Sequence, residues 1–135
     1  MSTDSKYNGI YIASRVRHAP KWHELREQGT PITSTWIDSG DGPDIDMRGI
    51  WYRCIDEASK SVATVLYRED DELLKGALIE AGAALGAGKP VYTVGFNGPE
   101  DMKIFSFLYH PMVVRCESLD CALSLASALI RPATR

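Results

Sequence analysis

The chain has 135 residues, 44% of them apolar and 24% charged, and its 15 Lys and Arg against 18 Asp and Glu give a net charge of −3. These values are typical of one globular domain and exclude a disordered or low-complexity chain. Proteins that bind nucleic-acid backbones or anionic membranes carry a basic excess, so we expect neither polymeric nucleic acid nor a membrane as a partner. No apolar run reaches the ~20 residues of a membrane span.

The first eight residues are polar and contain no apolar signal core. We therefore expect residues 1–8 to form a flexible segment and residues 9–131 to form a single domain. Cys54, Cys116 and Cys121 have no metal-ligand spacing, and reduced thiols are typical of the cytoplasm, where we place the protein. The three histidines share no close spacing either, so we expect no metal site.

The first half of the chain alternates strand and helix patterns. The run Ile10-Tyr11-Ile12-Ala13-Ser14 predicts a buried strand over residues 9–14, and Pro20 opens an amphipathic helix that Gly29 closes. β-Branched residues predict a second strand over 31–37. The loop at 38–44 is rich in Gly and Asp and is either a solvated connection or a loop over a ligand. Apolar residues at helical spacing then predict a helix over 50–58.

The second half continues the alternation. The nearly continuous apolar run at 61–67 predicts a third strand that is covered on both faces. The charged turn at 68–71 leads into a third helix that ends at residue 86 or 88. Residues 90–95 predict a fourth strand, 102–108 a short helix and 112–115 a fifth strand. The last helix spans 119–130, with Ser118 as its N-cap.

This alternation predicts an α/β fold, a three-layer sandwich around a five-stranded parallel sheet of the flavodoxin or Rossmann-like type. Ligands of such sheets bind beyond the carboxyl ends of the strands, so the loops at 14–20, 38–47, 68–75 and 95–101 are the ones of interest. None of them carries a glycine-rich dinucleotide fingerprint, a Walker lysine motif or a nucleophile elbow.

Glu80 is the most unusual residue of the sequence. It lies in an almost entirely apolar helix, and no other charged residue occurs within four positions of it. A carboxylate removed from water has a raised pKa, which functional sites tolerate, so Glu80 is a candidate catalytic residue. The alternative is that Glu80 lies on the one solvated stripe of this helix.

Two segments resemble the nucleoside 2-deoxyribosyltransferase superfamily. The run Ile10–Ser14 is similar to that family's opening strand, and Glu80–Val91 is similar to its Glu-x-Gly-x-Ala-x-x-x-Gly-Lys-x-Val segment. The likeness covers residues 9–130. It implies cleavage or exchange of the N-glycosidic bond of a 2′-deoxynucleoside or its 5′-monophosphate, with Glu80 as the nucleophile and Tyr11 as its hydrogen-bond partner. The nucleophile is a side chain, so the resemblance implies no cofactor.

The chain departs from the family where an aspartate binds the sugar. The nearest register places Arg53 there and Asp56 one turn later, so Asp56 is either the substitute or an ordinary exposed acid. Asp70 and Asp71 are candidates for the acid that protonates the leaving base, or they belong to a solvated turn.

The resemblance also suggests how the substrate is bound. One branch of the superfamily binds a 5′-phosphate through a basic loop after the first strand, which Ser14, Arg15 and Arg17 would provide, although the same loop could simply offset nearby acidic loops. That branch has a serine where this chain has Leu74, with Lys75 beside it. Trp36 could stack on the base beside Asp38, or pack in the core.

Family members complete the site with groups from a neighbouring subunit, and the apolar segment 102–109 could form such an interface or pack on its own sheet. We therefore expect a homodimer or larger homo-oligomer in which Ser106 or Lys103 reaches the partner's site. Two other functions stay open: glycosidase activity on an NAD-like or ADP-ribosyl compound, and a non-catalytic nucleotide-binding module.

Overall fold

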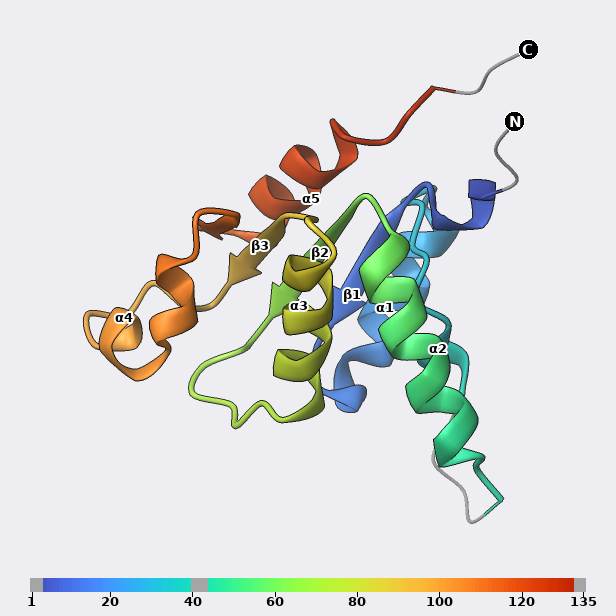
Figure 1. Ribbon diagram of the computed structural model, residues 1–135, viewed down its shortest axis with the longest axis horizontal. Helices are drawn as coiled ribbons and strands as arrows, with labels where there is room; N and C mark the ends of the chain where they lie inside the picture. The colour runs from blue at the N-terminus through green and yellow to red at the C-terminus, as the bar shows by residue number, and fades with distance from the viewer. Residues whose placement is uncertain (1–3, 40–43, 133–135) are drawn as a thin grey trace.

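The computed structural model describes residues 4–39 and 44–132 as an α/β fold around a parallel four-stranded sheet (Figure 1). Its strands lie side by side in chain order: β1 (Ile10–Ala13), β2 (Ala63–Tyr67), β3 (Val91–Val94) and β4 (Val113–Cys116). All residues of β1 and β2 are buried, as their continuous apolar sequences predict, whereas Val114 and Arg115 on the edge strand β4 are exposed.

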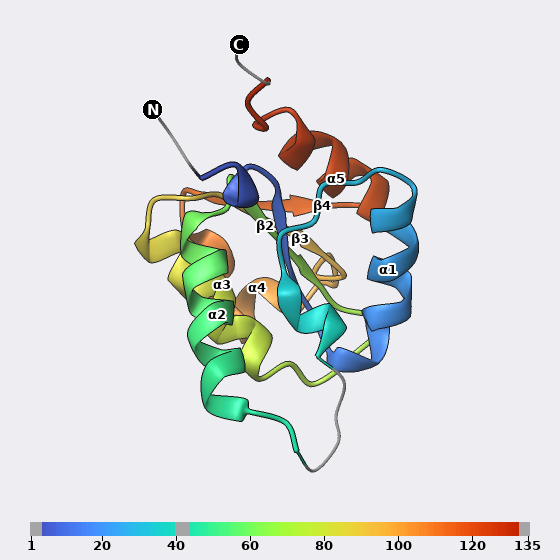
Figure 2. The ribbon, with the colours of Figure 1, turned by 90° about the vertical axis from the view of Figure 1, so that its right-hand side faces the viewer.

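Helices cover both faces of the sheet (Figure 2). The helices α2 (Met47–Lys60) and α3 (Gly76–Gly86) lie together on one face, while α1 (Ala19–Glu27) and α5 (Leu119–Ser127) lie on the other. A short helix, α4 (Asp101–Ile104), follows β3. Ser118 is the N-cap of α5, as predicted, and its Oγ accepts a hydrogen bond from Cys121 N.

The prediction of a five-stranded sheet is wrong, because residues 31–37 do not form a strand. Only Ile32 forms a bridge, parallel to Ile10, and Thr35–Asp38 is a 3₁₀ helix, η3. Side chains replace the missing ladder: Ile12 N donates to Ser34 Oγ (2.9 Å) and Trp36 Nε1 donates to Ile12 O (2.8 Å). With the edge of β1 paired in this way, the segment curls away from the sheet.

Two loops at the carboxyl edge are held together by a buried ion pair. Arg68, which follows β2, donates to Asp101 Oδ1 (3.0 Å) and stacks on Phe96 and Phe105. The aromatic residues of segment 102–109 join this cluster, and Phe107 packs against both Phe96 and Phe105. In the segment predicted to form an oligomer interface, Met102, Phe105, Phe107 and Leu108 therefore pack on their own domain, whereas Lys103, Ile104, Ser106 and Tyr109 are exposed.

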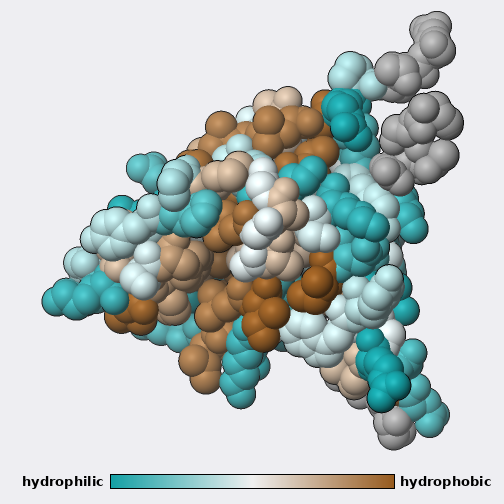
Figure 3. Space-filling model, viewed as in Figure 1, coloured by the Kyte–Doolittle hydropathy of each residue, from teal (hydrophilic) through white to brown (hydrophobic). Residues whose placement is uncertain are grey.

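Apolar surface gathers instead over α3 and the chain before it (Figure 3). Leu73 is 67% exposed and Ile79 is 60% exposed, while Ile104 and Tyr109 are the large apolar residues of 102–109 that stay exposed. No helix in the described ranges is long and apolar enough to cross a membrane.

The N-terminal segment is attached to the domain at residues 7 and 8. Tyr7 is buried at the end of a 3₁₀ helix, η1 (Asp4–Tyr7), and Asn8 bonds to the backbone of Arg131. Tyr7 and Asn8 of the expected flexible segment 1–8 therefore contact the domain, and residues 1–3 lie outside the described residues.

Replacing Ser34 by alanine tests how the edge of β1 is paired. Ser34 is 1% exposed, so Ser34→Ala leaves the Ile12 N–H buried without its acceptor. We expect the free energy of unfolding to fall by about 1–3 kcal/mol, measured by urea denaturation. The control Ser124→Ala, at an exposed position on α5, should change it little. Equal losses in the two variants would contradict this account.

Candidate functional site

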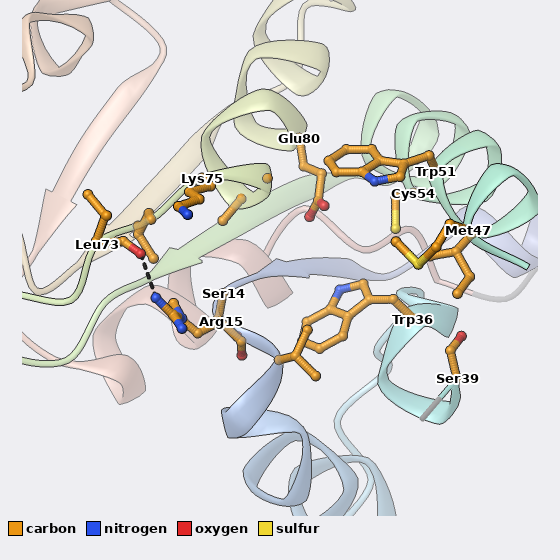
Figure 4. Close-up of a pocket in the computed structure, with 15 residues that line it drawn as sticks. Ser14, Arg15, Trp36, Ser39, Met47, Trp51, Cys54, Leu73, Lys75 and Glu80 are labelled. Atoms are coloured by element: carbon orange, nitrogen blue, oxygen red, sulfur yellow. Dashed lines mark hydrogen bonds between the residues drawn. The ribbon is translucent and has the colours of Figure 1, made fainter. Parts of the chain in front are cut away.

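A cavity of about 320 Å³ opens at the carboxyl ends of β1 and β2. It is framed by the loop after β1, by η3, by α2, and by the loop that leads from β2 into α3 (Figure 4). This is the edge of the sheet where the fold places ligands. Its walls are formed by Ser14, Arg15, Val16, Trp36, Ser39, Met47, Ile50, Trp51, Cys54, Leu73, Leu74, Lys75, Gly76, Ala77 and Glu80.

Glu80 lies in the wall of this cavity and is bonded to Tyr11. The Tyr11 hydroxyl donates a hydrogen bond of 2.9 Å to Glu80 Oε1, between residues 69 positions apart in the chain. Tyr11 is fully buried and Glu80 is 8% exposed, so the solvated-stripe interpretation of Glu80 is wrong. A residue of the sheet thus holds one carboxylate oxygen of Glu80, while the Glu80 side chain points into the cavity (Figure 4).

Burial raises the pKa of Glu80 to about 7, because the carboxylate loses hydration. The Tyr11 hydrogen bond opposes this shift, and the negative charge of Glu57 on α2 adds to it. Burial and the neighbouring Glu80 also raise the pKa of Tyr11 far above its usual range, so Tyr11 stays a hydrogen-bond donor. At neutral pH Glu80 is therefore poised between its acid and its carboxylate forms.

Two indoles form opposite parts of the wall around Glu80 (Figure 4). Trp36 is fixed by its hydrogen bond to Ile12 O, which leaves the ring face to line the cavity. Trp51 lies against Gly76, the first residue of α3, where a Cβ atom would be 2.8 Å from Trp51 Cη2 and 3.8 Å from Glu80 Oε2. Glycine at position 76 therefore lets the indole and the carboxylate come close together.

Two cationic side chains stand on the other side of the cavity. Arg15, which follows β1, donates from Nη1 to the backbone oxygen of Leu73 (2.9 Å), and Lys75 immediately precedes α3 (Figure 4). Both residues are exposed. The Arg15 bond uses one of five guanidinium N–H donors, so the group can still bind an anion.

The two loops that carry these cations are clamped by Glu72. Its carboxylate receives a hydrogen bond from Arg17 Nε (2.6 Å) and lies 2.9 Å from Nε2 of the buried His18. Burial alone would raise the pKa of Glu72, but hydrogen bonds from Glu69 N–H, His18 and Arg17 lower it to about 2. The clamp joins the loop after β1 to the loop after β2 across the cavity mouth.

Of the predicted site residues, the structure brings six together. Tyr11 lies beneath the cavity through its bond to Glu80, and five others line it: Ser14, Arg15, Trp36, Lys75 and Glu80.

The other four predicted residues lie away from the cavity wall. Arg17 is committed to Glu72, and Asp38 is held by both terminal nitrogens of Arg26 (2.9 and 2.8 Å). Asp56 faces the opposite direction, where it pairs with Tyr7 and Lys60, and Ser106 is exposed on the 3₁₀ helix Ser106–Tyr109. Asp70 and Asp71 are likewise exposed and outside the wall.

Sequence reasoning missed the roles of Cys54 and Glu72, and it left Trp51 as either a core or a pocket-wall aromatic residue. The helical spacing of Trp51 and Cys54 predicted a helix, but nothing in the sequence says that this stripe faces a cavity. Burial raises the pKa of Cys54 to about 11, so its thiol stays protonated beside Tyr11 and Glu80. Within residues 4–39 and 44–132, no three His, Cys, Asp or Glu side chains are grouped to hold a metal ion, and Cys54, Cys116 and Cys121 are free thiols.

The burial of Glu80 has a consequence for stability. Its pKa is about 7 in the folded protein against an ordinary 4.5, so between these pH values the folded state binds more protons than the unfolded state. The free energy of unfolding must then fall as pH rises through this window, by roughly 3 kcal/mol from this group. Glu80→Gln keeps an acceptor for Tyr11 and removes the titration.

We expect Glu80→Gln to become more stable relative to the unmodified protein as pH rises from 4.5 to 7.5, as measured by thermal unfolding. The matched control Glu24→Gln, at an exposed position on α1, should follow the unmodified protein across this range. A stability difference for Glu80→Gln that does not change with pH would show that the carboxylate is not desolvated.

No protein-family model matches this chain, and neither curated proteins nor solved structures provide a match. The resemblance of Ile10–Ser14 and Glu80–Val91 to deoxyribosyltransferases is therefore a likeness of motifs. The function has to be argued from the cavity, its carboxylate and its charges.

Proposed function

We propose that the protein cleaves or exchanges the N-glycosidic bond of a 2′-deoxynucleoside or its 5′-monophosphate through a covalent intermediate on Glu80. The observation that carries this proposal is the hydrogen bond from Tyr11 to Glu80 in the wall of an aromatic cavity. A desolvated carboxylate with one oxygen fixed and a side chain directed into a cavity is suited to attack an electrophilic carbon.

The proposed reaction has two displacements. In the first, a Glu80 oxygen bonds to C1′ of the sugar, the C1′–N bond breaks, and its electron pair leaves with the base. In the second, water or another base attacks C1′, and the electron pair of the ester bond returns to the carboxylate. Tyr11 holds Oε1 and stabilises the carboxylate that is consumed and then regenerated.

The walls supply what such a reaction needs besides the nucleophile. Trp36 and Trp51 offer flat apolar faces for a heterocyclic base and help to exclude water from a reactive intermediate. Arg15 and Lys75 offer positive charge for a 5′-phosphate. Asp56, in contrast, is tied to Tyr7 and Lys60, which argues against it as the sugar-binding acid.

A glycosidase acting on an NAD-like nucleotide would use the same carboxylate and walls, and a binding module would use the walls alone. A homodimer and a cytoplasmic location stay part of the proposal, as does a small-molecule nucleoside or nucleotide as the partner.

Release of free base tests the proposal directly. The protein should release base from a panel of deoxynucleosides and their 5′-monophosphates, followed by liquid chromatography. Glu80→Gln should abolish release because an amide cannot form the ester, whereas Tyr11→Phe should lower kcat more than it changes KM. Full activity in a folded Glu80→Gln protein would refute the mechanism. The absence of release across the whole panel would refute the proposed substrate class and leave the NAD-like glycosidase and the binding module.

The two arginines provide a matched test of phosphate binding. Arg15 lines the cavity and Arg17 is held by Glu72 outside it. Arg15→Ala should raise KM for the 5′-monophosphate roughly tenfold or more, as expected for a lost charge-assisted hydrogen bond, and leave KM for the nucleoside unchanged. Arg17→Ala should not show this substrate dependence. Equal KM changes for nucleoside and monophosphate in Arg15→Ala would remove the phosphate assignment.

A further inference from the structure

The positive and negative side chains of the cavity lie on opposite sides of it. Arg15 and Lys75 stand together where the loops after β1 and β2 meet, and the carboxylate of Glu80 lies across the cavity from them (Figure 4). A ligand that matches this arrangement is anionic at one end and cationic at the other. The phosphate of a nucleotide supplies the anionic end, which leaves the carboxylate end to be matched.

The carboxylate end has the features of a site for an organic cation. The Glu80 side chain points into the space between Trp36 and Trp51 (Figure 4). The sulfur atoms of Met47 and Cys54 lie in the same wall. Aromatic faces attract cations through their quadrupole, most strongly for tryptophan, and a desolvated carboxylate attracts them through its charge. A flat, positively charged heterocycle can stack on the indoles and pair with the carboxylate at the same time.

The acids around the cavity lead to the same substrate class. A neutral base needs a proton as it leaves the sugar, and an acid held in an ion pair is a poor donor. Asp38 is paired with Arg26, Asp56 with Lys60, and Glu72 with Arg17 and His18. Among the described residues that line the cavity, Glu80 is the one acid, and the proposed reaction uses it as the nucleophile.

From these observations we infer that the site selects nucleotides whose base already carries a positive charge, such as a pyridinium or an N7-alkylated purine. The inference rests on the proposed function and names its substrate class.

The chemistry balances without a proton donor. Glu80 forms the bond to C1′, and the electron pair of the C1′–N bond neutralises the ring nitrogen, so the base leaves as a neutral molecule. Water then bonds to C1′, the ester electron pair returns to Glu80, and the proton of the water passes to solvent. The sum is a cationic nucleotide and water giving a sugar phosphate, a neutral base and a proton.

A matched pair of substrates tests this inference. 7-Methyl-2′-deoxyadenosine 5′-monophosphate and 2′-deoxyadenosine 5′-monophosphate differ by one methyl group and one charge, because the methylated adenine has no ring N–H to lose at pH 8. Base release is measured at pH 8, with the spontaneous rate of each compound subtracted. We expect the KM of the methylated compound to be roughly tenfold lower, within the range of cation–π recognition. Trp51→Leu should reduce this ratio, and Trp51→Phe should retain most of it.

The outcomes separate this inference from the proposed function. Equal KM values for the two nucleotides would overturn the inference and leave the glycosidase standing. If no nucleotide reacts, the glycosidase fails, and binding of 1-methylnicotinamide against nicotinamide is measured by NMR titration. Tighter binding of the cation, lost in Glu80→Gln, would support a cation-selective site, and equal binding would overturn it.

Discussion

The hydrogen bond between Tyr11 and Glu80 is the interaction on which the site depends. Burying a carboxylate costs free energy, and the Tyr11 hydroxyl offsets part of that cost from the middle of β1. The bond joins α3 to β1, and Gly76, the first residue of α3, lies against Trp51. One polar contact in an apolar interior thus links the buried carboxylate to the sheet, beside one aromatic wall of the cavity.

Ion pairs join the loops at the carboxyl edge of the sheet. Glu72 joins Arg17 and His18 to the loop before α3, and Arg68 joins Asp101 to the end of β2. These pairs add side-chain contacts between loops that follow different strands. The pairing with Arg17 and His18 helps to lower the pKa of Glu72 to about 2, whereas burial raises the pKa of Glu80 to about 7, so these two carboxylates titrate in different pH ranges.

The candidate site could be predicted in part. Glu80 was identified because a charged residue is unusual inside an otherwise apolar helix. Its partner Tyr11 was implied by the motif resemblance. The direction of Asp56 could not be foreseen, because its pairing with Tyr7 depends on how the N-terminal segment returns to α2. The role of Glu72 was missed because its partners Arg17 and His18 are far away in sequence.

The sequence by itself determined the alternation of strands and helices and the parallel sheet, because these follow from periodicity and composition that local segments carry. It singled out Glu80 as a candidate, but the structure decided that Glu80 is buried. Only the tertiary structure decided the conformation of residues 31–37. Their β-branched composition suits a strand, but Ser34 and Trp36 satisfy the backbone of Ile12 with side chains, and the chain turns into η3. Local propensity is weaker than this exchange of backbone for side-chain hydrogen bonds, and that exchange places Trp36 in the cavity wall.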